Sequence, residues 1–319
     1  MWNRVELIFE LKSPLHIGYL PSGFSVSAPT RYYVPGRNFW GALTQRITEF
    51  LFSTPVGKDY MQIGQMIKKN FRFSYFYIYD GKNIYLPKYS EKGFYYGEIE
   101  EYDFQYRFIG SRVMTAIDNS TGKAKDKTLH EIEFISEKFI DNDGTIQNTK
   151  IIGTIWIRQM DHFYANKNKN IKIKEDDVYI DDFKIFEEIT IGGEQNIGFG
   201  RLKLNSIYKG RKYCSFVEDF TDKQEVKIKT SSGAPIFGHV PYDERLGFLG
   251  DLELLSGRQY YKNDGKTEKK RYEKPGEYIV PPELYFAPGT ILYPIEQNSI
   301  FQTDLDFVLR WDGVLYRIV

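Results

Sequence analysis

Aromatic side chains recur at every second position in short runs of this 319-residue chain. The clearest run is FRFSYFYIYD at residues 71–80, and aromatic residues make up 17% of the sequence. A period of two places alternate side chains on opposite faces of a strand. Aromatic residues also fit the pleated surface of a sheet well. The chain is therefore expected to be rich in strands.

Periodic patterns predict the order of elements before residue 210. Val5, Leu7 and Phe9 alternate with polar residues and predict a first strand, buried mainly on one face and ended by Pro14. After Pro35 and Gly36 the spacing changes to three and four residues, which predicts an amphipathic helix. Later elements are a hairpin at 71–89 with an Asp80-Gly81 turn, a second hairpin at 111–135, a strand at 150–160, a helix at 176–189 and a strand at 201–208.

The pattern divides the chain into residues 1–210 and a second, β-rich module at 211–319. The polar segment 209–225 is the best candidate for a linker between them, and the charged run at 260–277 reads as a mobile hairpin or loop. Strands interrupted by helices favour an α+β fold, with helices on one face of an antiparallel sheet.

Composition excludes several classes of protein. Lysine plus arginine equals aspartate plus glutamate at 43 each, so any contact with nucleic acid must come from local patches. Cys214 is the only cysteine, which excludes an internal disulfide, and no spacing of cysteine and histidine suits zinc. No apolar run approaches the ~20 residues of a membrane span. We expect a cytoplasmic protein with no membrane contact, no metal and no cofactor.

The loop TIGGEQNIGFGRLKL, residues 190–204, is the first candidate for chemistry. Glycines allow positive φ and close approach of the backbone, so that N–H groups can point at phosphate oxygens. Arg201 and Lys203 add charge, and Phe199 has two possible places, inward against protein or outward against a base. The alternative is a turn that touches only protein. The glycines of this loop are Gly192, Gly193, Gly198 and Gly200.

Four motifs, in this order over residues 5–204, resemble the RAMP superfamily of CRISPR-associated proteins. They are SPLHIG after the first strand, YVPGRNFWGAL at the first helix, TAIDNSTGKAKDKTLHEIEFI in mid-chain and GGEQNIGFGRLKL. The chain looks most like the subunits of type III RNA-guided effector complexes. The resemblance implies a ferredoxin-like, RRM-related domain with a glycine-rich loop as its signature. A second module after that loop, possibly ferredoxin-like too, suits the subunits that cap the filament at the 5′ end of the guide RNA.

Two further candidates for RNA contact lie elsewhere. Arg37 and Asn38 fall in the first helical turn, where free N–H groups and the helix dipole favour an anion; alternatively Asn38 caps the helix and Arg37 is solvated. In relatives the mid-chain hairpin forms a thumb that wedges into the guide–target duplex. Here Arg112 lies at its root, and its tip carries Lys123, Lys125 and Lys127. A plain solvated hairpin is the alternative.

Catalysis is not expected. The relatives that slice target RNA use an aspartate between the first strand and the first helix, and residues 17–38 of this chain contain no carboxylate. His16 is a minority candidate for the general acid or base of a metal-independent endoribonuclease that processes repeat RNA. The expected function is therefore a non-catalytic subunit that binds guide RNA (crRNA), grips its 5′ tag and caps the complex. Its partners would be other Cas subunits and, indirectly, target RNA. The alternatives are a repeated backbone subunit, the endoribonuclease, or an interaction domain without RNA.

Overall fold

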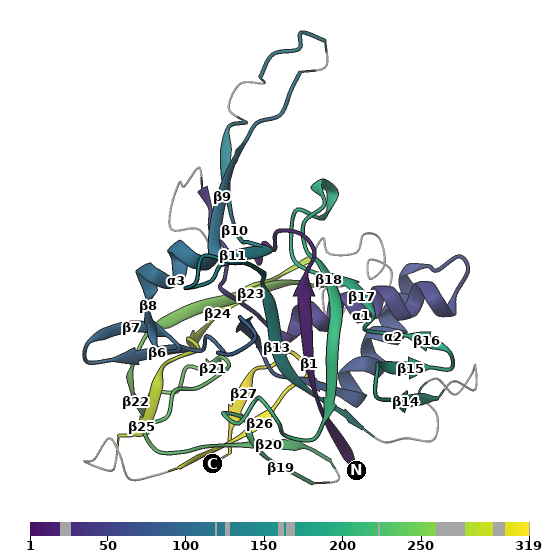
Figure 1. Ribbon diagram of the computed structural model, residues 1–319. Coiled ribbons are helices and arrows are strands. Elements are labelled where there is room, and N and C mark those ends of the chain that lie inside the picture. The colour runs from purple at the N-terminus through teal and green to yellow at the C-terminus, as the bar shows by residue number, and fades with distance from the viewer. Residues whose placement is uncertain are drawn as a thin grey trace.

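The computed structural model describes residues 1–19, 27–118, 120–124, 128–158, 163, 170–222, 224–259, 278–295 and 304–318. Its centre is a seven-stranded sheet (Figure 1). The strands of this sheet are β1 (Trp2–Leu11), β3 (Tyr33–Val34), β4 (Phe71–Phe73), β5 (Phe76–Tyr79), β13 (Lys150–Arg158), β17 (Glu188–Thr190) and β18 (Arg201–Lys209). Their order is β17-β18-β1-β13-β5-β3, with β4 also paired to β13.

The strand order of this sheet confirms the ferredoxin-like prediction for the first domain, although the described residues between β13 and β18 contain no α-helix where that arrangement has its second one. Helix α1 (Gly36–Leu51) connects β1 to the second main strand, β5, and β13 and β18 follow as third and fourth. β1 pairs antiparallel with both β13 and β18. In space the order is fourth, first, third, second, as the ferredoxin-like arrangement requires.

The helix predicted at residues 176–189 is wrong. A three-stranded sheet, β14 (Ile171–Ile173), β15 (Val178–Ile180) and β16 (Phe183–Lys184), occupies most of this region. Val178 and Ile180 are buried and β-branched, and Asp181 takes a left-handed turn with φ 54° between β15 and β16. Turn-forming aspartates on both sides of a short β-branched run favour a hairpin over a helix.

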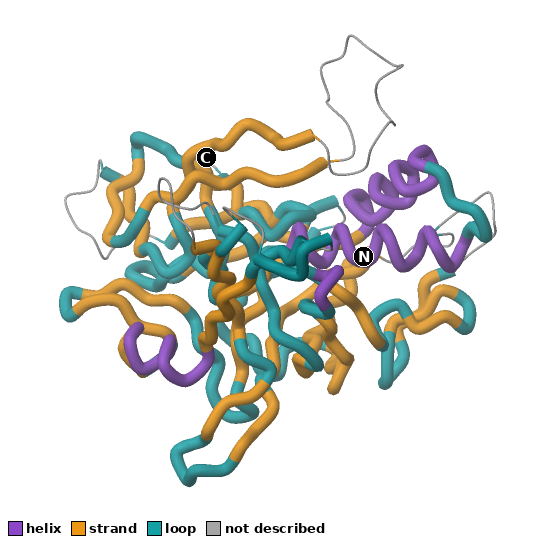
Figure 2. The backbone as a smooth tube through the Cα atoms, turned by 90° about the horizontal axis from the view of Figure 1, so that it is seen from above, coloured by secondary structure: helices purple, strands orange, loops and turns teal. Residues whose placement is uncertain are grey.

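Helices α1 and α2 (Gly57–Asn70) cover one face of the central sheet (Figures 1 and 2). α1 begins at Gly36, as predicted, and buries Phe39, Leu43 and Ile47 at the expected spacing. These side chains pack against Phe9 of β1 and Phe76 of β5 in one core. The sequence pattern did not predict α2, because only a narrow stripe of it is buried. None of the described helices is long and apolar enough to span a membrane.

The second module packs against the opposite face of the sheet. Its described part is β-rich, as predicted, and contains no helix. The strands form three small sheets: β19 (Glu218–Thr221), β20 (Val226–Thr230), β26 (Leu305–Leu309) and β27 (Leu315–Arg317); β21 (Val240–Pro241), β24 (Tyr278–Phe286) and β23 (Leu252–Gln259); and β22 (Leu246–Leu249) with β25 (Ile291–Pro294). Tyr75, Tyr77 and Trp156 are fully buried in the core between the sheet and the module.

The first strand is consequently buried on both faces, which corrects the one-sided burial expected from its sequence. Leu7 and Phe9 face the helices, whereas Ile8 belongs to the core under the second module. Glu6 is also fully buried. Its carboxylate accepts backbone N–H groups from residues 212, 213 and 214, which lie in the segment expected to be a linker. That segment is therefore packed against β1.

The two predicted hairpins are present. Asp80 and Gly81 form the first turn, with φ 103° at Gly81, although the returning arm is reduced to a bridge between Tyr79 and Ile84. The second hairpin, β9 (Ile109–Met114) and β10 (His130–Ile135), projects far from the body, and we call it the thumb hairpin (Figure 1). The remaining elements are β2 (Ser27–Ala28), β6 (Pro87–Ser90), β7 (Gly93–Tyr96), β8 (Ile99–Glu100), α3 (Glu101–Phe108), β11 (Lys138–Ile140) and β12 (Ile146–Asn148).

Candidate nucleic-acid interface

The glycine loop, residues 191–200, connects β17 to β18 and is held tightly against the end of β1. Gly200 has φ 82°, and its amide donates to the Pro14 carbonyl at 2.8 Å. A Cβ on Gly200 would lie 1.9 Å from the Ile191 carbonyl oxygen, so no other residue fits there without a backbone shift. Gly198 also has a positive φ, 91°, but its Cα faces open space. Close contacts therefore fix the backbone of the loop at Gly200, whereas Gly198 has free space beside it.

His16 lies between the glycine loop and the thumb hairpin. Its carbonyl accepts the Gly193 amide at 2.9 Å, and a Cβ on Gly192 would lie 2.3 Å from the same oxygen. The ring is 8% exposed, and Nδ1 donates to the Glu133 carbonyl of β10 at 2.8 Å. Because a carbonyl only accepts, Nδ1 carries the proton. These contacts join the segment that follows β1, which contains His16, to the glycine loop and to the thumb hairpin.

Phe199 takes the inward of its two expected places. The ring is 1% exposed and packs at 5.5 Å, edge on, against Phe134 of the thumb hairpin. The guanidinium of Arg112 lies 5.7 Å from the Phe199 ring and 6.0 Å from the Phe134 ring. The glycine loop thus anchors the root of the thumb hairpin and places the exposed Arg112 beside it.

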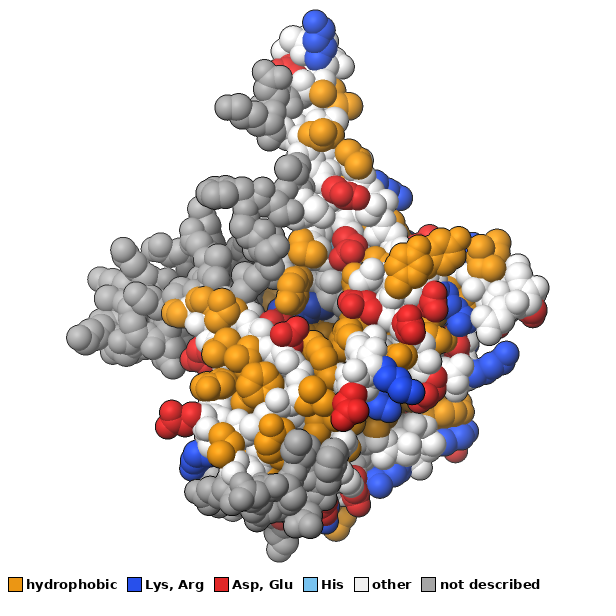
Figure 3. All heavy atoms as spheres, turned by 90° about the vertical axis from the view of Figure 1, so that its left-hand side faces the viewer, with side chains coloured by type: hydrophobic (Ala, Val, Ile, Leu, Met, Phe, Trp, Pro, Cys, Tyr) orange, Lys and Arg blue, Asp and Glu red, His pale blue; other side chains and the backbone are white. Residues whose placement is uncertain are grey.

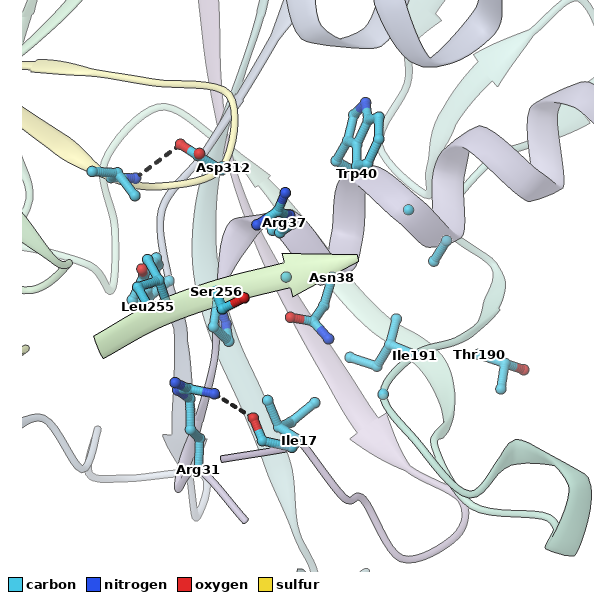
Figure 4. Close-up of a pocket in the computed structure, with 18 of the residues that line it drawn as sticks. Ile17, Arg31, Arg37, Asn38, Trp40, Thr190, Ile191, Leu255, Ser256 and Asp312 are labelled. Atoms are coloured by element: carbon cyan, nitrogen blue, oxygen red, sulfur yellow. Dashed lines mark hydrogen bonds between the residues drawn. The ribbon is translucent and has the colours of Figure 1, made fainter. Parts of the chain in front are cut away.

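A cavity of about 510 Å³ brings together two regions that the sequence singled out separately. Gly192 of the glycine loop and Arg37 and Asn38 of α1 all line it. The second module closes the other side, with Leu255 and Ser256 of β23 and Asp312 of the β26–β27 turn (Figure 4). The cavity lies between the two domains and is lined by segments that are far apart in sequence.

The start of α1 differs from the expected anion site in one respect. The Arg37 amide donates to the Asp312 carbonyl at 3.2 Å, and the Asn38 amide donates to the Pro35 carbonyl at 3.0 Å. No side chain caps the helix, so the alternative in which Asn38 is the cap is not realised. These two amides are occupied by protein, and any anion here would be bound mainly by side chains.

The two arginines that line the cavity, Arg31 and Arg37, differ in whether the protein already neutralises their charge. Arg31 forms an ion pair with Glu253 and donates to the Gly18 carbonyl. Burial lowers the pKa of the Arg37 guanidinium, which lies 5.8 Å from the Trp311 ring. Figure 4 shows Arg37 between Asp312 and Trp40, while Asn38 lies on the side of Ile17 and Ile191. Of these two arginines, Arg37 is therefore the one whose charge is available to a ligand in the cavity.

The thumb hairpin carries both charge and exposed apolar side chains. Lys123 lies near its end, where Asp118 and Lys123 share a backbone hydrogen bond of 2.9 Å. The other two candidates at the tip, Lys125 and Lys127, lie outside the described residues. Val113, Ile117 and Leu129 are 61–65% exposed, and hydrophobic side chains follow the hairpin outward (Figure 3). A two-stranded ribbon with an apolar edge can enter a space between stacked bases.

Arg201 and Lys203 both lie exposed on β18, outside the cavity. Lys203 stands opposite Glu10 of β1 and Glu188 of β17 in the sheet register. Carboxylates on neighbouring strands reduce the local positive potential. Arg201 has no acidic cross-strand neighbour in this register, since it pairs with Thr190. Of the two, Arg201 is better placed to meet a phosphate.

The described residues contain no group of three or more His, Cys, Asp or Glu side chains arranged to hold a metal ion. Gly257 of β23 and Trp311 of the β26–β27 turn adjoin Arg37, and Lys68 of α2 lies over the Trp311 ring; no sequence pattern had pointed to these residues as part of a site. A lysine in the last turn of a helix, a glycine in a strand and a tryptophan in a turn are all common in unrelated proteins. Only the fold brings them together.

Comparisons with known proteins identify one family. The model of the RAMP superfamily matches residues 8–203. A search of curated proteins finds no match. A chain in the cryo-EM structure of type III-B Cmr-beta bound to cognate target RNA and AMPPnP is similar with a TM-score of 0.47 and 12% identity. The alignment covers 91% of this chain and 85% of that one. A chain of apo Cmr-beta aligns with a TM-score of 0.33 and 9% identity, over 64% of this chain and 96% of that one.

Proposed function

This chain belongs to the RAMP superfamily, and we propose that it is a non-catalytic, guide-RNA-binding subunit of a type III CRISPR effector complex. It grips the 5′ tag of the crRNA and caps the filament of subunits. Its partners are the crRNA, other Cas subunits and, through the guide, target RNA.

One observation carries the proposal: the glycine loop and the start of α1 line the same cavity. Glycine backbone permits close approach of a second chain, and a nearby arginine supplies charge for phosphate. The overall charge of zero requires that RNA affinity come from such local sites. The cavity is the place where both candidate regions contact the same stretch of RNA.

The thumb hairpin supports a role on a guide–target duplex. It stands clear of the body, and the glycine loop fixes its root through Phe199. Its exposed Val113, Ile117 and Leu129 suit insertion between base pairs, while Lys123 suits the backbone. Target RNA would therefore meet this subunit at the thumb hairpin.

The second module favours a cap over a repeated backbone subunit. It packs against one face of the central sheet and contributes one wall of the cavity. Its outer surface exposes apolar side chains on β23 and β24, including Leu252, Leu254 and Leu284 at 38–47% (Figure 3). An apolar surface of this kind suits contact with a neighbouring subunit. We therefore propose one copy per complex, docked through this module.

The proposal assigns His16 a structural task in place of catalysis. Its Nδ1 is held by the Glu133 carbonyl, and its ring lies beside Gly193. A general acid or base needs a nitrogen within reach of the RNA. Incubation of the purified protein with repeat hairpin RNA, with and without Mg²⁺ or Mn²⁺, is expected to give no cleavage. Cleavage abolished by His16→Ala would establish the endoribonuclease alternative.

The experiment that tests the proposal is isolation of the protein with its native complex. We expect a co-purified short RNA with one fixed 5′ end, and a single copy of this chain by native mass spectrometry. Several copies that increase with guide length would favour the backbone subunit. Absence of RNA from an intact complex would contradict the proposal as a whole.

A further inference from the structure

Among the described arginines whose Nε is buried without a partner, Arg37 is the one whose side chain donates no hydrogen bond. Six described arginines have a buried Nε without a partner. In five of them the terminal nitrogens donate to the protein: Arg4, Arg31, Arg46, Arg72 and Arg107. Arg37 has no side-chain hydrogen bond or ion pair to any described residue, and burial lowers its pKa. A desolvated charge whose side chain has no hydrogen-bond partner is costly, so this position favours an anionic ligand.

Lys68 brings a second cation to the same place. Its ammonium lies over the rings of Trp311 at 3.9 Å and Trp40 at 4.6 Å, and the two indoles meet edge to face at 4.8 Å. Lys68 too has no hydrogen bond or ion pair to a described residue. Burial, and then the charge of Arg37, lower the pKa of Lys68 to about 8. The indole pair holds this side chain in place and leaves its N–H groups free to donate.

The second module sets the position of Arg37. A Cβ on Gly257 of β23 would lie 2.2 Å from Arg37 Nη1, so the strand backbone lies directly against the guanidinium. Trp311 covers another side at 5.8 Å. The charge of Asp312 raises the pKa of Arg37 against the larger effect of burial, but Asp312 makes no ion pair with it. Arg37, Gly257 and Asp312 line the cavity, whereas Lys68 and Trp311 adjoin it through Trp40, which is also a lining residue. Two cations and one carboxylate leave a net positive charge in this region.

We propose that Arg37 and Lys68 form a binding site for one phosphate group of an RNA backbone, completed by Gly257 and Trp311 of the second module. The cavity of about 510 Å³ exceeds the needs of a phosphate alone and has room for the attached ribose and base. Phosphate matches the donors, because guanidinium and ammonium groups both bind its oxygens strongly. The identity of the RNA as guide rests on the proposed function; the anion site does not.

Binding of fluorescently labelled guide RNA to Arg37→Gln, Lys68→Gln and Lys69→Gln tests the site. Lys69 is the matched control, because it is the next residue of α2, carries the same charge and is exposed. Loss of one charged donor in a buried site is expected to weaken binding about tenfold for Arg37→Gln and Lys68→Gln. Lys69→Gln should change affinity less than about twofold. Equal effects of the three substitutions would overturn the site.

Gly257→Ala separates geometry from charge. The added methyl displaces the flexible end of Arg37 and removes no charge, so we expect the same weakening as for Arg37→Gln. This variant, and Lys68→Gln, keep the test informative if Arg37→Gln does not fold. Unchanged RNA affinity in Gly257→Ala with a displaced Arg37 would also contradict the site.

Inorganic phosphate distinguishes failure of the site from failure of the proposed function. We expect phosphate to raise the melting temperature of the parent and of Lys69→Gln, but not of Lys68→Gln. If this pattern holds while the parent binds no RNA, the anion site stands, its phosphate has another source, and the proposed function fails. If RNA binds the parent and all variants equally and phosphate has no effect, the site fails and the proposed function stands.

Discussion

The helix side of the central sheet is packed almost only by apolar side chains, whereas its module side is also joined by hydrogen bonds and ion pairs. On the helix side the rings of Phe9, Phe39 and Phe76 pack against one another. On the module side Tyr77 donates to the Phe237 carbonyl at 2.6 Å, and Trp156 donates to Asp219 at 2.9 Å.

The module side also contains a chain of buried polar groups. Tyr75 contacts Nδ1 of His239 at 2.6 Å, His239 Nε2 contacts Glu253 at 2.9 Å, and Glu253 forms an ion pair with Arg31. Directional bonds fix one orientation of two bodies, which apolar contacts alone specify less sharply. The difference suggests that the helices stabilise the first domain, while the polar contacts set where the second module closes the cavity.

Truncation on the helix side should have the largest effect on stability. Phe39→Ala removes a fully buried ring and leaves a cavity, so we expect a loss of about 3–5 kcal/mol in the free energy of unfolding. Urea denaturation followed by circular dichroism measures it. Phe50 on the same helix is 41% exposed, and Phe50→Ala should cost less than half as much. Equal losses would mean that this core is not the main source of stability.

Acid should weaken the module side through Glu253. Burial alone would raise the pKa of Glu253, but the hydrogen bond from His239 and the charges of His239 and Arg31 lower it to about 2. A depressed pKa stabilises the folded state above the ordinary value of 4.5, and this contribution is lost as the pH falls from 4.5 towards 2.

Comparison of Glu253→Gln with the parent isolates that contribution. The difference in the free energy of unfolding should be largest at neutral pH and should shrink as the pH approaches 2. A difference that stays constant over this range would show that the charge of Glu253 is not what joins the module to the sheet.

Glu6→Gln should loosen the module and leave the helix side intact. The carboxylate accepts backbone N–H groups at 2.6–3.2 Å, and an amide would present a donor to some of them. We expect a loss of about 2 kcal/mol. Hydrogen exchange should speed up in residues 212–219 and stay slow in α1. Uniform acceleration in both regions would remove the distinction between the two faces.

The smallest loss in the free energy of unfolding should come from removing the single hydroxyl of Tyr77. Tyr77→Phe leaves the Phe237 carbonyl without its donor in a buried place, at an expected cost of about 1 kcal/mol. Phe76→Tyr is the converse change, since it puts a hydroxyl among the apolar side chains of the helix side. It should cost more than Tyr77→Phe; a smaller cost would show that the helix side tolerates polar groups.

Local patterns in the sequence predicted much of the first domain. The alternation around Phe9 and the spacing of Phe39, Leu43 and Ile47 correspond to β1 and α1. The same logic failed at residues 176–189, where spacings near three and four arise from short strands and turns. The sequence pattern also did not predict the burial of Glu6. A carboxylate in a strand is normally expected to face solvent, and the backbone groups that Glu6 binds are known only from the structure.

The candidate site was predictable only in parts. Glycine spacing and the helix start pointed to Gly192 and Arg37, which do share a cavity. Neither periodicity nor composition relates Lys68 to Trp311, because their contact depends on how the second module docks on the sheet. Phe199 shows the same limit: its burial follows from the place of the thumb hairpin, which is set by tertiary packing.

The place of β1 in the sheet has a consequence for synthesis of the chain. Leu7 faces Gly153 on one side and Ile207 on the other, so the first strand made gains its last neighbour some two hundred residues later. At about 5–20 residues per second, β1 remains without its full set of neighbours for roughly ten seconds or more. Its apolar side chains are open to wrong partners during that time, and pairings this distant form slowly. The nascent protein should therefore depend on chaperones until β18 has emerged.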